Sequence, residues 1–278
     1  MIDIQSSIPT ISQYEELLSS ELFRTMEEYS NNFLITNQLV LREYAAKWVK
    51  DPFHQWSRQW EYVYVYSRIV EHISRRSAGM NILDAGSGIT FFPYFLKTKL
   101  DPVNILCCDV DPELNEIYDN VNKNRDQSVK FINFNLEDIS SADESLDIVY
   151  CISVIEHTKD FSKIIDEFYR IIKPRGKLIV TFDISLDGAA QLSPEKSEFL
   201  LDCIYSKFSG NARVTDLDSL LSKSDIVTTN YAYKLNPNLI PMNKLSLLKS
   251  RVKSLIRMEP IKKYPYPLSF YCLDVTKK

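Results

Sequence analysis

The sequence Asn-Ile-Leu-Asp-Ala-Gly-Ser-Gly, residues 81–88, constrains the fold of this chain more than any other segment. An apolar strand leads into Asp84, then into Gly86 and Gly88, and the following residues have the pattern of a helix. Glycine allows the turn to adopt positive φ angles and lets the backbone approach a ligand closely. Open α/β sheets bind nucleotides at strand–turn–helix units of this kind. The segment therefore predicts such a sheet, with a ligand site at its first turn.

The residues of this turn also indicate which ligand it binds. A dinucleotide fingerprint requires a third small residue three positions after the second glycine, and the bulky Phe91 stands there. The carboxylate of Asp84 suits an amino group better than a phosphate. These two observations favour S-adenosylmethionine over a dinucleotide.

A second acidic residue ends the next predicted strand. Residues 103–108 form a short apolar run followed by Asp109, as expected for a buried parallel strand with an acid at its carboxyl end. A carboxylate there can accept hydrogen bonds from both ribose hydroxyls, and such charged hydrogen bonds contribute about 1.5–3 kcal/mol each. Asp109 is therefore a candidate for ribose binding.

Strands and helices alternate along the chain, which implies a parallel sheet with right-handed crossovers. A helix is predicted over 160–172, because its apolar residues have helical spacing. The remaining strands are predicted at 129–133, 146–152, 177–182, 226–233 and 268–275. The expected fold is a Rossmann-like α/β domain with a seven-stranded, mostly parallel sheet, an antiparallel strand 7 and a helical N-terminal extension.

Several segments, in this order, resemble the motifs of class I S-adenosylmethionine-dependent methyltransferases. Residues 81–88 resemble the first motif, and Cys-Cys-Asp-Val-Asp at 107–111 resembles the ribose-binding segment. Asn-Leu-Glu-Asp at 135–138 resembles the adenine loop, and residues 172–180 resemble the junction into strand five. The resemblance implies S-adenosylmethionine as the cofactor.

The resemblance also implies a set of cofactor-binding residues. The glycines would hold the methionine part, the acid of the second strand the ribose, and the loop after the third strand the adenine. These residues are Asp84, Gly86, Gly88, Asp109, Val110, Asn135 and Leu136. Two positions depart from the family pattern. Thr90 replaces a third glycine, and Asn135 replaces an acid, although its amide can still pair with the adenine edge.

Residues 1–76 are expected to form a helical extension that covers a methyltransferase domain at 77–278, with helical insertions at 184–222 and 241–263. An aromatic cluster, 53–66, stands just before the first strand, and its Trp60 and Tyr64 are predicted to be core residues. In class I relatives this segment often folds over the cofactor. Arg58, Glu61 or Tyr62 is therefore predicted to help hold the methionine end of the cofactor or the substrate, with Arg58 and Tyr62 as the candidates for cofactor binding.

Transfer of a methyl group to a hydroxyl requires a base that removes the hydroxyl proton. His157 and Asp183 follow the fourth and fifth predicted strands at the ligand-binding edge, and His54 lies in the aromatic cluster. These three residues are the catalytic candidates. Glu156-His157 is similar to the metal motif Glu-x-x-Glu-His of some methyltransferases, but Ser153 replaces its first ligand, so no metal is predicted.

Composition limits the possible partners. The net charge of −4 gives no reason to expect nucleic-acid binding, and no apolar stretch approaches the length of a membrane span. Five cysteines without metal-ligand spacing and the lack of a signal-like N-terminus predict a cytoplasmic protein. Segment 241–263 carries seven Lys or Arg residues against one Glu. It is either a solvated helix face or a site for an anionic partner or membrane surface.

The leading hypothesis is a methyltransferase that acts on a hydroxyl of a small molecule, such as a sugar or glycan intermediate. Two alternatives remain open: an N-methyltransferase that acts on a small-molecule amine, and a non-catalytic scaffold with the methyltransferase fold. The sequence does not identify the methyl acceptor or the oligomeric state.

Overall fold

The fold was analysed in a computed structural model of the chain. It describes residues 4–48, 50–74, 79–100, 102–123, 125, 129–188, 191–209, 216–240 and 265–278. The basic segment 241–263, predicted to be a helical insertion, lies outside the described residues. No helix among the described ranges combines the length and the apolar character needed to cross a bilayer.

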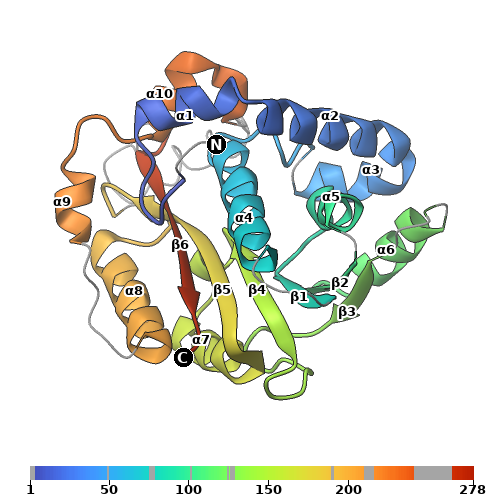
Figure 1. Cartoon of the computed structure of the whole chain (residues 1–278). Helices are drawn as coiled ribbons and strands as arrows, with labels where there is room; N and C mark the ends of the chain where they lie inside the picture. Colours follow the sequence, from blue (N-terminus) through green and yellow to red (C-terminus); the bar gives the residue numbers. More distant parts are fainter. Residues whose placement is uncertain are drawn as a thin grey trace, which may run out of the picture.

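A six-stranded sheet with helices on both faces forms the centre of the molecule (Figure 1). Its strand order is β3-β2-β1-β4-β5-β6, with the first five strands parallel and β6 antiparallel to β5. The strands are β1 Met80–Ala85, β2 Val103–Asp109, β3 Lys130–Asn133, β4 Leu146–Ile152, β5 Ile172–Ser185 and β6 Leu268–Thr276. The mostly parallel Rossmann-like sheet is therefore confirmed. The order reverses between β1 and β4, which is where sheets of this type bind ligands.

The prediction of seven strands is wrong for the described residues. Residues 226–233, predicted as strand six, make only an isolated bridge at Ile226 and then form helix α10, Thr229–Leu235. The side chain of Thr228 accepts a hydrogen bond from the Tyr231 N–H and starts this helix as its N-cap. The segment predicted as strand seven is β6, and it is antiparallel as expected.

The N-terminal segment covers the free edge of β6, where a further strand would otherwise pair. Cys272 N donates to Ser7 O at 3.1 Å, and Asp274 N donates to Ser6 Oγ at 3.1 Å. Ser6 Oγ also donates to Asp274 Oδ1 at 2.9 Å. An uncovered edge strand invites pairing with other chains, so these contacts protect the sheet.

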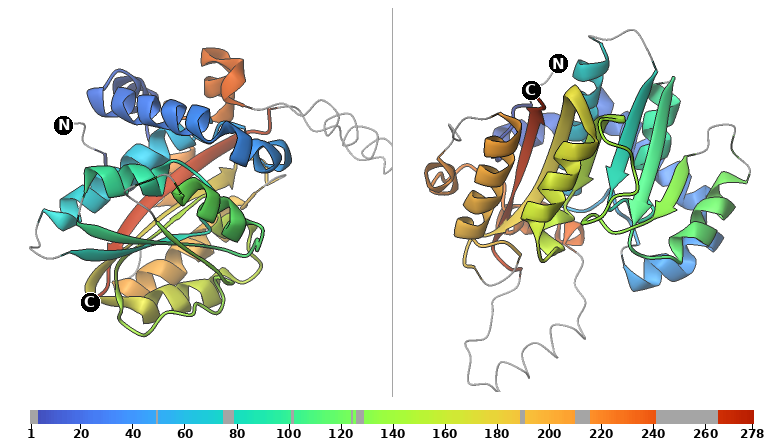
Figure 2. Two further views of the ribbon diagram at one scale, coloured as in Figure 1. Left: turned by 90° about the vertical axis from the view of Figure 1, so that its right-hand side faces the viewer. Right: turned by 90° about the horizontal axis from the view of Figure 1, so that it is seen from below.

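Ten α-helices and two short 3-10 helices occur in the described residues. They are α1 Ile11–Leu18, α2 Glu21–Thr36, α3 Gln38–Lys47, α4 Arg58–Ile73, α5 Phe92–Lys99, α6 Leu114–Asn122, η1 Ile155–His157, α7 Phe161–Ile171, α8 Pro194–Phe208, α9 Leu217–Leu221, α10 and η2 Pro237–Leu239. One core cluster joins α4, α5 and α6 to one face of the sheet, and the other joins α7 and α8 to the opposite face. Helices α1, α2 and α10 lie across the edge where β5 ends (Figures 1 and 2).

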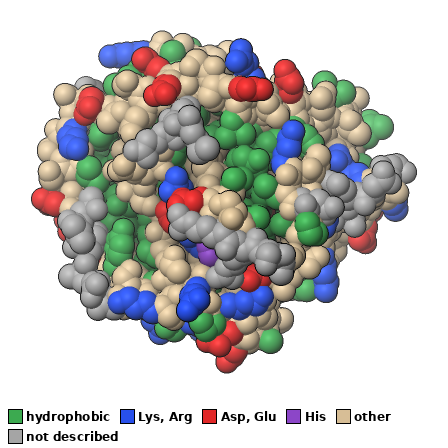
Figure 3. Space-filling model, viewed as in Figure 1, with side chains coloured by type: hydrophobic (Ala, Val, Ile, Leu, Met, Phe, Trp, Pro, Cys, Tyr) green, Lys and Arg blue, Asp and Glu red, His purple; other side chains and the backbone are tan. Residues whose placement is uncertain are grey.

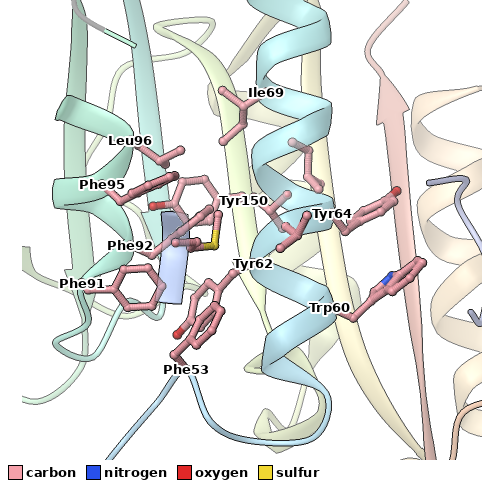
Figure 4. Close-up of a cluster of buried hydrophobic side chains, with 14 of the residues drawn as sticks. Phe53, Trp60, Tyr62, Tyr64, Ile69, Phe91, Phe92, Phe95, Leu96 and Tyr150 are labelled. Carbon is pink, nitrogen blue, oxygen red and sulfur yellow. The ribbon is translucent and has the colours of Figure 1, made fainter. Parts of the chain in front are cut away.

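Aromatic side chains pack α4 against the sheet on one side and against α5 on another (Figure 4). Trp60 and Tyr64 point toward β6 and are buried, at 1% and 0% exposed, which confirms their assignment to the core. Tyr62 points the other way, and its ring centroid lies 5.0 Å from that of Phe91. Phe91 is fully buried, and its ring centroid also lies 5.5 Å from that of Phe53. The residue that breaks the dinucleotide fingerprint therefore anchors the N-terminal helices to the glycine turn.

We expect Phe91→Ala to lower the free energy of unfolding by about 3–5 kcal/mol, because it removes a fully buried ring from a packed cluster. Denaturant unfolding followed by circular dichroism measures this change. Leu39→Ala, at a residue 81% exposed on α3, is the control and should change stability by less than about 0.5 kcal/mol. Equal effects of the two substitutions would show that Phe91 is not an anchor.

Candidate functional site

The turn after β1 has the backbone conformation that only glycine adopts without strain. Gly86 and Gly88 have φ angles of +75° and +50°. A Cβ on Gly86 would lie 2.5 Å from the Cγ1 atom of Val154, a residue that lies just beyond β4. Gly86 N and Ser87 N both donate to Cys108 O, at 2.9 and 2.8 Å. These bonds hold the turn against the end of β2 and next to the end of β4.

Asp84 is a buried carboxyl group at the end of β1, with 5% of the residue exposed. Burial raises its pKa to about 8, and the nearby negative charge of Asp109 adds to the rise. No cation pairs with Asp84 among the described residues. A bound amino group would supply the missing positive charge and favour the ionised carboxylate.

Asp109 ends β2 with its carboxylate already oriented. Gly88 N donates to Oδ2 at 3.0 Å, and Asp111 N donates to Oδ1 at 3.1 Å. Each oxygen keeps a further lone pair, so the carboxylate can still accept hydrogen bonds from two ligand hydroxyls. Asp109 therefore has the geometry that its predicted role in ribose binding requires.

The loop after β3 lies next to Asp109. Phe134 N donates to Asp109 O at 3.2 Å, which brings the ends of β2 and β3 together. Val110 is 63% exposed and Leu136 is buried. Asn135 is exposed, and its Oδ1 accepts from Glu137 N at 3.0 Å, which leaves its amide nitrogen free to face a ligand. The residues predicted to bind adenine and ribose therefore share one end of the sheet.

A buried hydrogen-bonded group lies on the other side of the glycine turn, where β4 ends. Arg58, the first residue of α4, donates to Glu61 Oε2 at 2.5 Å and to Ser153 Oγ. Ser153 Oγ donates to Glu61 Oε1 at 2.7 Å, and Glu61 is fully buried. Ser153 adopts a φ of +45°, a left-handed conformation that is strained for any residue except glycine. The two predicted residues Arg58 and Glu61 thus meet at the end of β4.

Glu156 and Asp183 form a carboxyl pair beside this group. Asp183 N donates to Glu156 Oε1 at 3.2 Å. Glu156 Oε2 and Asp183 Oδ1 are both buried and have no hydrogen-bond partner among the described residues. Burial raises the pKa of Asp183 to about 7, the charge of Glu61 adds to this rise, and Arg58 opposes it. Burial, together with the charge of Asp183, raises the pKa of Glu156 well above its usual range.

Tyr62 lies between the two halves of the site. The charges of Arg58, Asp84 and Glu61 all act on its hydroxyl, which also forms a hydrogen bond with the Thr90 side chain. The ring itself is buried against Phe91. Tyr62 therefore sets the spacing between the glycine turn and the group around Arg58.

The two candidate histidines lie in different surroundings. His157 is exposed at the end of η1, and partial burial of its ring with the charge of Arg58 lowers its pKa. His54 Nδ1 lies 2.7 Å from Asp51 Oδ2, and its Nε2 lies 2.8 Å from Glu27 Oε1. The hydrogen bond with Asp51 contributes most to raising the pKa of His54 to about 9, so this ring is protonated at neutral pH. A protonated imidazole bound by two carboxylates is not available as a base.

Sequence reasoning missed three residues near the site: Glu156, Ser153 as a hydrogen-bond partner, and Tyr44. The Tyr44 hydroxyl lies so close to Gly88 that a Cβ there would be 2.3 Å from it. The amphipathic pattern of the extension predicted helices but not which side chain reaches the turn. For Glu156, its place directly after the fourth strand was the available signal.

Comparison with known proteins identifies the domain that these residues build. Residues 83–180 match the family model described as "Methyltransferase domain". This segment is a class I methyltransferase domain. The resemblance to S-adenosylmethionine-dependent methyltransferases that the sequence indicated is thereby confirmed, and with it S-adenosylmethionine as the cofactor.

Relatives of the methyltransferase domain differ in their named acceptors. The chain is 24% identical over 160 residues to an arsenite methyltransferase from Halobacterium salinarum, covering 56% of this chain and 39% of that protein. It is 23% identical over 198 residues to a ubiquinone biosynthesis O-methyltransferase from Rickettsia akari, covering 65% and 76% of the two chains. The chain thus spans less than half of the first relative.

Among solved structures, this chain is similar to an S-adenosylmethionine-dependent methyltransferase from Aquifex aeolicus. The TM-score is 0.43 at 21% identity, and the match covers 54% of this chain and 80% of the other.

The residues of the methyltransferase domain fit S-adenosylmethionine. The buried Asp84 carboxyl, which pairs with no cation in the described part of the chain, suits the amino group of the donor, and the oriented Asp109 carboxylate suits its ribose. A side chain at Gly86 would collide with Val154, so the turn stays open only with glycine. These residues would hold the donor on the β2 side of the turn, which leaves the carboxyl pair on the β4 side for a second ligand.

We expect Asp109→Asn to weaken binding of S-adenosylhomocysteine, the demethylated donor, by about 10- to 100-fold, because charged hydrogen bonds to the ribose are lost. Isothermal titration calorimetry measures the Kd. Asp119→Asn on the exposed side of α6 is the control and should bind like the wild type. Wild-type affinity in the Asp109 variant would contradict the ribose assignment.

The surroundings of His54 predict a pH dependence of stability. A histidine whose pKa is raised in the folded state stabilises the protein fully below its unfolded pKa of about 6.5 and loses this effect as pH rises through about 9. His54→Gln should therefore lower Tm most at pH 6, with a difference that shrinks above pH 9. Thermal unfolding of both proteins between pH 6 and 10 checks this. A Tm difference that is independent of pH would contradict it.

Proposed function

We propose that this protein transfers the methyl group of S-adenosylmethionine to a hydroxyl group of a small molecule, such as a sugar or a glycan intermediate. The observation that supports this most directly is the carboxyl pair of Glu156 and Asp183. Each residue holds a buried oxygen without a partner among the described residues, at the sheet edge where ligands bind. An acceptor with hydroxyl groups can supply the missing hydrogen-bond partners.

The carboxyl pair suits proton removal from a hydroxyl. The donor supplies an electrophilic methyl group when it is bound. Asp183, with a pKa of about 7, is ionised in a large fraction of molecules at neutral pH and can accept the hydroxyl proton. Glu156, with a pKa well above its usual range, keeps its proton and can donate a hydrogen bond to the acceptor. Holding the acceptor oxygen in line can contribute about 7–11 kcal/mol toward lowering the barrier.

The surface and the charge of the chain agree better with a small acceptor than with a nucleic acid. Figure 3 shows acidic and basic side chains mixed on the described part of one face, with Lys and Arg gathered toward its lower margin. The formal net charge is −4. The relative named as a ubiquinone biosynthesis O-methyltransferase also acts, by its name, on oxygen.

One observation favours a second candidate, an N-methyltransferase. Glu61, Glu156 and Asp183 place three carboxyl groups around the single guanidinium of Arg58, an excess of acid that would attract a cationic amine. A panel of monosaccharides, nucleotide sugars, phenols and amines, incubated with methyl-labelled donor and read by mass spectrometry, separates the two activities. A non-catalytic scaffold would bind the donor in calorimetry but label no compound in this panel.

The Asp183 carboxyl predicts how the rate of hydroxyl methylation depends on pH. Because the ionised form accepts the proton, and this pKa belongs to the protein without ligands, kcat/KM should rise with pH through about 7 and then level off. Asp183→Asn should lower kcat by about 10²- to 10⁴-fold with little change in donor affinity, and should abolish the pH dependence. Steady-state kinetics between pH 5.5 and 9 with the labelled hydroxyl acceptor measure both.

Asp202→Asn, on the exposed side of α8, is the matched control and should keep the wild-type profile. If Asp183→Asn raises KM for an amine and leaves kcat unchanged, the N-methyltransferase is favoured. If His157→Asn, and not Asp183→Asn, abolishes the pH dependence, the exposed histidine is the base and the proposed role of Asp183 is wrong.

A further inference from the structure

Helix α3 lies outside the segment that matches the methyltransferase family, yet it reaches the donor turn. The hydroxyl of Tyr44 lies against Gly88, where a Cβ would be 2.3 Å from it. Helix α3 also packs beside α6, the helix that follows the ribose-binding strand. The wall of the donor site opposite the sheet is therefore supplied by the N-terminal extension.

Tyr44 is surrounded by the polar groups of the donor site. Burial raises its pKa to about 12, a hydrogen bond with the backbone of Ile89 opposes this rise, and the carboxylates of Asp109 and Asp111 add to it. The phenol is thus neutral and keeps its O–H at every physiological pH. A neutral O–H next to Asp109 can donate to a ligand oxygen or accept from a ligand hydroxyl.

Lys47, one helical turn beyond Tyr44, ties α3 to the loop that follows β2. Its Nζ lies 3.2 Å from Asp111 Oδ2 and 3.4 Å from Glu113 Oε2. The Lys47 side chain is 52% exposed, and ion pairs at this level of exposure hold elements together only weakly. Such a link can open to admit a ligand and close again.

We propose that α3 is a movable wall of the donor site, in which Tyr44 hydrogen-bonds to the donor ribose and Lys47 holds the helix closed. This inference rests on the proposed function, because it takes S-adenosylmethionine as the ligand. The ribose is the partner because the Tyr44 hydroxyl lies against Gly88, whose N–H donates to the carboxylate of Asp109 at 3.0 Å. Tyr44 is thus a binding residue, and Lys47 acts through it as a positioning residue.

The first test is calorimetry with two ligands, S-adenosylhomocysteine and methylthioadenosine, which share the ribose but not the amino acid. Tyr44→Phe, which removes only the hydroxyl, should raise the Kd of both by about five- to tenfold with no change in Tm. A loss confined to S-adenosylhomocysteine would overturn the ribose assignment. If Tyr44→Phe binds both ligands with wild-type affinity while Asp109→Asn binds them more weakly, the inference is wrong and the proposed function stands. Failure of the wild type to bind either ligand would instead overturn the proposed function.

The second test follows the helix itself. Trp48 directly follows α3 and is 60% exposed, whereas the other two tryptophans, Trp56 and Trp60, are 6% and 1% exposed. Addition of S-adenosylhomocysteine should therefore change the tryptophan emission, and Trp48→Phe should remove the change. An emission change that persists in Trp48→Phe, or none in the wild type under saturating ligand, would contradict closure of α3.

The same signal measures the role of Lys47 in stopped-flow dissociation. Lys47→Ala should speed release of S-adenosylhomocysteine a few-fold at low salt, and the difference should vanish near 1 M salt, where exposed charges are screened. Lys50→Ala is the matched control, since Lys50 is exposed and has no ion pair among the described residues. Equal release rates for Lys47→Ala and the wild type at low salt would overturn the latch.

Discussion

The hydrogen bonds among Arg58, Glu61 and Ser153 hold the N-terminal helices in place against the sheet. They join the first turn of α4 to the end of β4, and α4 carries the other N-terminal helices with it. Glu61 is fully buried, so loss of its partner would leave an unpaired charge in the core, at a cost of about 3–5 kcal/mol. The strained φ of Ser153 persists because both neighbours bind its hydroxyl. The N-terminal helices are therefore part of the site and not a separate appendage.

The sheet was largely predictable because its strands are apolar runs with distinct ends. The segments predicted at 103–108 and 146–152 match β2 and β4 almost residue for residue. The helix predicted over 160–172 is α7, and the Asp160 side chain caps its first turn. The strand predicted at 226–233 was wrong, because a short apolar pattern does not distinguish a strand from a helix that begins after the N-cap Thr228. The residues that cover the edge of β6 come from the opposite end of the chain.

The residues proposed to hold the donor form a visible sequence motif, and those proposed to hold the acceptor do not, for a physical reason. Asp84, Gly86 and Gly88 lie close together in the sequence, so their motif is visible in one short segment. The acceptor half assembles from residues far apart, and its decisive features are burial and missing partners, which no local pattern shows. Glu156 shows this difference. In the sequence, Glu156 beside His157 resembled part of a metal motif. Its buried oxygen without a partner among the described residues results from the way β4 and β5 end. His54 is the opposite case, because two carboxylates make it a structural cation.

The charge balance of the acceptor half connects it with the donor half. Carboxyl groups outnumber the single guanidinium of Arg58, and burial together with the charge of Glu61 keeps Asp183 partly protonated near neutral pH. A cation bound nearby favours the ionised form of such a carboxyl. On the proposed function, the sulfonium charge of the donor is such a cation, and the sulfur of the demethylated product is neutral. Donor binding and ionisation of Asp183 therefore favour each other by linkage. After methyl transfer, Asp183 carries the proton and the sulfur of the product is neutral. The same linkage favours this combination.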